Sequence, residues 1–219
     1  MHIPDGFLNV ATLTTTAVVS AGGVAGAIRI TKDKLKEKQV PLMGVLAAFI
    51  FVAQMLNFPI VGGTSGHFMG AALAAILLGP WAAVLIMTCV LVVQSFIFQD
   101  GGLLALGANV FNMGIVGSFA SYGVYRLVIG LLGQSRKSRS IGGFAGAWLA
   151  VFLAAVACAL ELVFSGVSPM KIVLPAMAGI HALIGIAEGL ITTAVLSVVM
   201  ATRADLMGLP QVEPVRGAK

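Results

Sequence analysis

FMGAALAAILLGPWAAVLIMTCVLVVQSFIF, residues 68–98, contains no charged side chain and has the character of membrane-spanning sequence. A short apolar helix is expected from about His67 to Leu78, where Gly79-Pro80 would end it, and a second helix from Trp81 to Phe98. The whole chain is similar, with 59% hydrophobic and only 10% charged residues. Because soluble domains carry about 25% charged residues, we predict an all-α polytopic membrane protein that forms one integral membrane domain, residues 1–219.

Together with this stretch, the apolar runs before and after it predict seven transmembrane helices. The first would be capped by Asn9 or Thr12 and end near Ile30. An N-terminal segment (residues 1–10) is expected to precede a helix bundle (residues 11–201) and a polar tail (residues 202–219). Beyond those named above, the remaining expected helices are Pro41–Asn57, Leu104–Leu132, Gly142–Phe164 and Ala176–Ala201.

The basic residues predict the orientation of the chain in the membrane. With seven crossings, all of the thirteen Lys and Arg residues except Lys171 fall on the same side. Because basic loops stay in the cytoplasm, the N-terminus is predicted outside and the C-terminus in the cytoplasm. The sequence pI of 9.6 is then explained by topology, and we expect no nucleic-acid partner, only the lipid bilayer and other proteins.

The chain opens with Met1-His2-Ile3-Pro4-Asp5-Gly6-Phe7-Leu8, a pattern suited to chelation. Residues 1–28 contain no Lys or Arg, unlike a secretory signal, so a free amino group at Met1 is expected. That amino nitrogen and the backbone and imidazole nitrogens of His2 can close two adjacent chelate rings in one plane. A fourth nitrogen would complete the square that suits Ni(II) or Cu(II).

His67 is the candidate for this fourth nitrogen. It ends a Gly-rich loop, residues 58–67, whose backbone cannot face lipid and must lie in protein or line a cavity. Metal-bound imidazoles need hydrogen-bond partners that orient them; the candidates are Thr64, Ser65 and, less strongly, Asp5 and Asn112. Since amino and imidazole groups ligate only without their protons, binding is expected to weaken between neutral and mildly acid pH.

Other interpretations of the polar residues remain open. Ser65 within Gly63-Thr64-Ser65-Gly66, paired with His181 on a late helix, outlines a rhomboid-like intramembrane serine protease. His181 and Glu188 share a helix face, and ionisable residues at such depth are functional candidates. A self-sufficient channel or secondary transporter is a third class, which metal flux in liposomes would reveal. No P-loop motif occurs, so ATP hydrolysis would need another subunit.

The Met1–Leu8 start, together with Gly63-Thr64-Ser65-Gly66-His67, closely resembles the nickel/cobalt substrate-capture (S) components of energy-coupling-factor (ECF) transporters, the CbiM/NikM family. The resemblance implies the six-helix S-component core plus an extra N-terminal helix, in a prokaryotic cytoplasmic membrane. It implies metal ligands at Met1, His2 and His67, and no enzyme activity. It also implies a transmembrane coupling protein, two cytoplasmic ATPase subunits and a small accessory membrane protein as partners. The Pro4-Asp5 version of the start favours Ni(II) as substrate, with Co(II) as the alternative.

Overall fold

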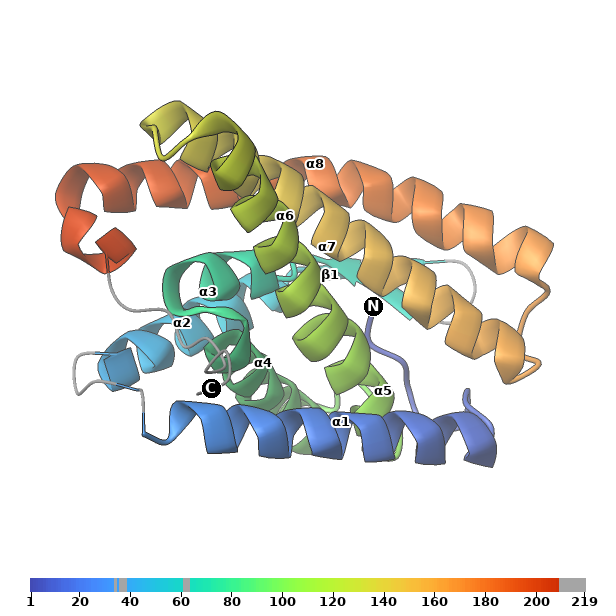
Figure 1. Ribbon diagram of the computed structural model, residues 1–219. Coiled ribbons are helices and arrows are strands. Elements are labelled where there is room, and N and C mark those ends of the chain that lie inside the picture. Colours follow the sequence, from blue (N-terminus) through green and yellow to red (C-terminus); the bar gives the residue numbers. More distant parts are fainter. Residues whose placement is uncertain (34, 36–38, 61–63, 209–219) are drawn as a thin grey trace, which may run out of the picture.

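The computed structural model describes residues 1–33, 35, 39–60 and 64–208 (Figure 1). Helices dominate this part of the chain, in the order α1 (Val10–Thr31), α2 (Gln39–Gln54), α3 (Ala71–Leu78), α4 (Pro80–Val93), α5 (Leu106–Asn109), α6 (Gly117–Leu132), α7 (Arg136–Phe164) and α8 (Met170–Thr202). Two π-helical segments, η1 (Gln94–Phe98) and η2 (Val110–Val116), extend α4 and join α5 to α6. A short 3-10 helix, η3 (Ala204–Gly208), follows α8, and most of the predicted tail, residues 209–219, lies outside the described residues.

Within the described residues, five helical stretches are long and apolar enough to cross a membrane. They are Val10–Thr31, Pro80–Ile97, Leu106–Leu132, Arg136–Phe164 and Met170–Thr202. The first begins where predicted, because the Asn9 side chain accepts a hydrogen bond from the Thr12 N–H and so caps α1. With 16 and 8 residues, α2 and α3 are shorter than the ~20 residues that a bilayer requires. The helical fold class agrees with the prediction. By their length, however, fewer of the described helices than the predicted seven could cross a membrane.

The Gly-rich loop departs from the all-α prediction by forming a β-hairpin. Strands β1 (Asn57–Ile60) and β2 (Thr64–His67) pair antiparallel, with Asn57 opposite His67. The hairpin satisfies backbone groups that a loop at this depth would leave unpaired. The following helix was predicted from His67 but begins at Ala71, because Gly70 adopts a left-handed conformation with φ of 80°.

Two predicted helix starts were too late. The Ser135 side chain accepts a hydrogen bond from the Ser138 N–H, so α7 begins at Arg136 and includes the basic residues that were expected in a loop. Helix α8 begins at Met170 and contains Pro175. Pro175, which was expected to precede the helix, therefore lies in its second turn.

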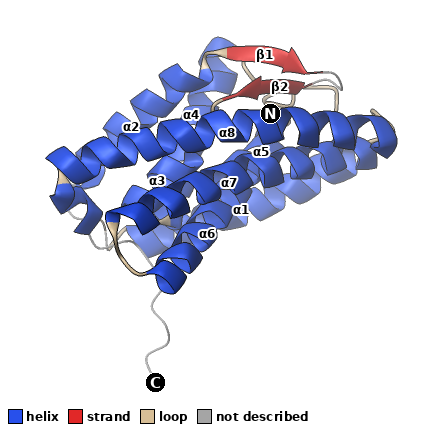
Figure 2. Ribbon diagram, turned by 90° about the horizontal axis from the view of Figure 1, so that it is seen from above, coloured by secondary structure: helices blue, strands red, loops and turns tan. Residues whose placement is uncertain are grey.

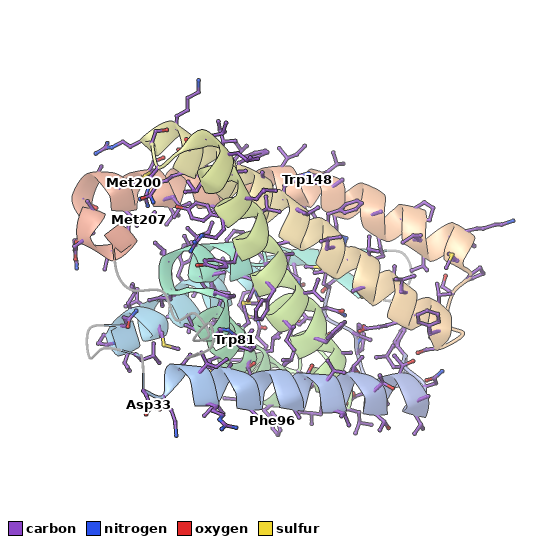
Figure 3. All side chains as sticks on the ribbon, viewed as in Figure 1. Asp33, Trp81, Phe96, Trp148, Met200 and Met207 are labelled. Atoms are coloured by element: carbon purple, nitrogen blue, oxygen red, sulfur yellow. The ribbon has the colours of Figure 1, made fainter. Side chains whose placement is uncertain are left out.

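Close helix packing relies on small residues along α7 and α8. The Trp148 Nε1–H, on α7, donates to the Ala182 carbonyl of α8 at 3.0 Å (Figure 3). A Cβ at Gly185 would lie 2.9 Å from the Trp148 ring, so glycine permits this approach.

The arrangement separates two ends of the bundle. The C-terminal ends of α1 and α8 and the α6–α7 turn, which carry most of the described basic residues, gather at the left of Figure 1, whereas the α7–α8 turn lies at the right. The β1–β2 hairpin lies along one edge of the bundle, against α8, with the N-terminus beside it (Figure 2).

Candidate metal site

The N-terminal segment, residues 1–9, folds back into the bundle, and its first three residues are buried. Asn109 of α5 holds the backbone of Ile3 from both sides: its Oδ1 accepts from the Ile3 N–H at 2.8 Å, and its Nδ2 donates to the Ile3 carbonyl at 3.2 Å. The Gly102 N–H also donates to that carbonyl at 2.9 Å. These bonds fix the position of the two residues that precede Ile3.

Asp5 anchors the same segment to the turn before α5. Its carboxylate oxygens accept from the backbone N–H groups of Leu103, Leu104 and Ala105 at 3.0, 2.8 and 3.2 Å. Asp5 was a weaker candidate for orienting an imidazole, but the structure places its carboxylate on backbone groups at a helix start, the usual place for a capping carboxylate.

The Met1 amino group is fully buried between the N-terminal segment and the hairpin. It donates to the Ser65 carbonyl and lies 3.2 Å from the Ser65 Oγ. Burial lowers the pKa of the amino group from 8.0 to about 5. At neutral pH the nitrogen is therefore neutral and carries a lone pair.

Two imidazoles stack beside this amino group. The rings of His2 and His67 lie with their centroids 4.5 Å apart and their planes inclined by 24°. The His67 Nδ1–H donates to the Phe68 carbonyl at 2.6 Å, and among the described residues its Nε2 has no partner. A buried nitrogen without a partner is costly, so this lone pair is a candidate ligand.

The other imidazole is held by a glutamine. Gln94 of η1 accepts at its Oε1 from the His2 Nε2–H at 3.1 Å, which leaves the lone pair on Nδ1. The Asp100 Oδ1 lies 3.4 Å from that Nδ1. Burial, and secondarily the Met1 amino group, lowers the pKa of His2 to about 3, and the same two causes lower the pKa of His67 well below 6.5. Both rings are neutral at neutral pH, the form that binds metal.

The structure thus brings together Met1, His2 and His67, which the sequence singled out as ligands. No group of three or more His, Cys, Asp or Glu side chains suited to a metal occurs in the described part of the chain. A metal held here would therefore depend on the amino and backbone nitrogens as well as on the two imidazoles.

The other residues predicted to orient the imidazoles also make different contacts in the structure. Ser65 contacts the amino group, whereas Asn112 donates to the Glu161 Oε2 at 2.7 Å. The Thr64 backbone pairs with Ile60, and its side chain lies outside what the structure describes.

Sequence reasoning missed Gln94, Asn109 and Asp100, which hold or face the N-terminal segment. Asn57 in turn donates to the Asp100 Oδ2 at 3.0 Å. In the sequence, the feature that could have indicated these three residues was a polar side chain within or beside an apolar run. In the structure, they lie in or next to the π-helical segments, which are frequent at functional sites.

Ser65 and His181 form no hydrogen bond with each other in the described structure. The His181 Nδ1–H donates to the Met177 carbonyl at 2.8 Å, and the Ser65 Oγ faces the Met1 amino group. Glu188 accepts hydrogen bonds from the backbone of residues 69 and 70.

Similar proteins transport metals. A solved truncated transition metal transporter matches with a TM-score of 0.83 at 36% identity, covering 92% of this chain and 99% of that one. A putative fused nickel transport protein, NikMN, of Archaeoglobus fulgidus is 44% identical over 213 residues, 94% of this chain and 68% of that protein. A cobalt transport protein, CbiM 2, of Pelobacter propionicus is 36% identical over 222 residues, 97% and 96% of the two chains.

These relatives identify a multi-pass membrane protein of metal transport and give the serine protease alternative no support. Residues 2–206 match the model of the cobalt uptake substrate-specific transmembrane region, so the chain belongs to the CbiM family.

Proposed function

We propose that the chain is the substrate-specific subunit of an ECF-type uptake transporter and captures Ni(II), or Co(II), from outside the cell. The ligands are the Met1 amino nitrogen, the backbone nitrogen and Nδ1 of His2, and Nε2 of His67. The observation that carries the proposal is the stack of His2 and His67 at 4.5 Å beside the buried Met1 amino group. The proposal requires the mature chain to begin at Met1.

The chemistry of this donor set favours nickel. Three nitrogens from one dipeptide impose a plane, and planar nitrogen sites suit Ni(II) and Cu(II), whereas Zn(II) prefers a tetrahedron. The hydrogen bonds from His2 to Gln94 and from His67 to Phe68 leave the two proposed ring nitrogens, Nδ1 of His2 and Nε2 of His67, without a proton. The Asp100 carboxyl group beside His2 adds an oxygen that favours a cation.

Orientation and partners complete the proposal. The basic ends of α1 and α8 and the α6–α7 turn face the cytoplasm, and the metal site opens outward. Because the sequence has no P-loop, two cytoplasmic ATPase subunits, acting through a transmembrane coupling protein, drive release inward. A small accessory membrane protein is a further partner implied by the resemblance.

A metal titration of the purified protein tests the ligand set. Adding Gly-Ser before Met1 converts the amine into an amide and should lower the Ni(II) affinity by more than about 100-fold, since even residues behind metal ligands contribute 10- to 100-fold. His2→Ala should have a similar effect.

The matched control carries Gly-Ser after Lys219 and should bind nickel like the unaltered protein. Tight nickel binding by the N-terminally extended protein would rule out the amino group as a ligand.

A further inference from the structure

The segment that joins His67 to α3 is held from two helices. Both carboxyl oxygens of Glu188, on α8, accept backbone hydrogen bonds: Oε2 from the Met69 N–H and Oε1 from the Gly70 N–H, each at 2.7 Å. From the opposite side Gln54, at the end of α2, donates its Nε2–H to the Met69 carbonyl at 2.6 Å. Glu188 is 1% exposed and Gln54 fully buried, so water cannot substitute for either contact.

The start of α3 has no capping side chain of its own. Gly70 occupies the cap position, and a glycine offers no side chain to satisfy the free N–H groups at a helix start. A Cβ at Gly70 would lie 2.6 Å from the Ile50 Cγ1, so the backbone passes too close to α2 for a capping side chain. Glu188, from another helix, accepts instead from the N–H groups of Met69 and Gly70, which immediately precede α3.

The same contacts determine where the His67 imidazole lies. Phe68 is the only residue between His67 and Met69, and its carbonyl accepts the hydrogen bond from the His67 Nδ1–H. Displacing Met69 and Gly70 would therefore move both the backbone of His67 and the group that orients its ring. An unbroken chain of hydrogen-bonded groups links Glu188 to the His67 Nε2.

We propose that Glu188 is a positioning residue that sets the metal selectivity of the site. It holds the His67 Nε2 where this atom can serve as the fourth nitrogen ligand beside those of Met1 and His2. This inference rests on the proposed function, because it assumes that these residues bind the metal. With the fourth ligand held in place, a metal ion that prefers square-planar coordination is favoured over one that prefers tetrahedral coordination.

Glu188→Gln tests the inference with little change in side-chain size. The amide retains one acceptor oxygen but turns an N–H donor toward one of the two backbone N–H groups. The Ni(II) affinity should fall by about 10- to 100-fold and the Zn(II) affinity by less, so that the ratio of the two decreases. The visible absorption of bound Ni(II), which reports planar coordination, should shift.

Glu161→Gln is the matched control. Glu161 is also a buried glutamate in a long apolar helix, α7, but its partner is the Asn112 side chain. This variant should keep both the affinity ratio and the absorption spectrum of the unaltered protein.

A second variant keeps the inference testable if Glu188→Gln does not fold. Gln54→Met removes the hydrogen bond from the other side of the same segment and should change the affinity ratio in the same direction. A folded Glu188→Gln protein with an unchanged ratio and spectrum, or failing that an unchanged Gln54→Met protein, would overturn the role of Glu188. Failure of the unaltered protein to bind nickel would instead overturn the proposed function.

Discussion

The protonation of single residues determines how the proposed site responds to pH. In solution an α-amino group titrates near 8.0 and an imidazole near 6.5, which led to the expectation of weaker binding already at mildly acid pH. Burial lowers these pKa values to about 5 for Met1 and about 3 for His2. Protons on these two groups therefore compete with the metal only at lower pH.

We predict that the Ni(II) affinity falls about tenfold per pH unit from pH 8 to pH 6, because the His2 backbone nitrogen ligates only after it loses its amide proton, and that it falls more steeply below about pH 5, where the Met1 amino group takes up a proton. The sign follows from linkage: a lowered pKa means that the folded state takes up a proton only at or below that value, and proton uptake opposes ligation. Isothermal titration in buffers of matched ionic strength measures the profile. An affinity that stays constant from pH 8 to pH 6 would instead show that the His2 backbone nitrogen keeps its proton and is not a ligand.

At the scale of an element, the turn before α5 controls the docking of the N-terminal segment. Gly102 packs directly against Asp5, and a Cβ there would collide with the Asp5 carboxylate and backbone nitrogen. The same glycine donates its N–H to the Ile3 carbonyl. A side chain at this position must push the N-terminal segment away from α5.

Gly102→Ala is therefore expected to weaken Ni(II) binding by about tenfold or more, in the range for groups that support metal ligands, while the helices remain folded. Gly123→Ala, on α6, is the control because a Cβ at that glycine meets nothing within 4 Å. Nickel titration and circular dichroism of both variants provide the measurement. Equal affinities would show that the contact of Gly102 with Asp5 does not position the site.

At the scale of the whole molecule, the separation of basic ends from the α7–α8 turn predicts the topology. Lys171, at the start of α8, should face outward, and the exposed Gln134, in the α6–α7 turn, should face the cytoplasm. Lys171→Cys and Gln134→Cys, each in a chain with Cys89 and Cys158 replaced by serine, can be compared by labelling with a membrane-impermeant maleimide.

The Lys171→Cys protein should react in intact cells, and the Gln134→Cys protein only after permeabilisation. The opposite pattern would place the metal site on the cytoplasmic side and contradict uptake from outside.

The sequence alone was enough to predict the membrane class, the long helices and a cap at Asn9 or Thr12, of which the structure shows Asn9, because apolar run length and capping are local properties. The sequence also indicated Met1, His2 and His67 as candidate metal ligands, because a terminal amino group and imidazoles are nitrogen donors. The partners of the site were decided by the tertiary structure, since each depends on groups distant in the chain. Glu188 meets Met69 across 119 positions, and Asn109 meets Ile3 across 106. Such pairs form only when helices pack and buried polar groups must find partners away from water.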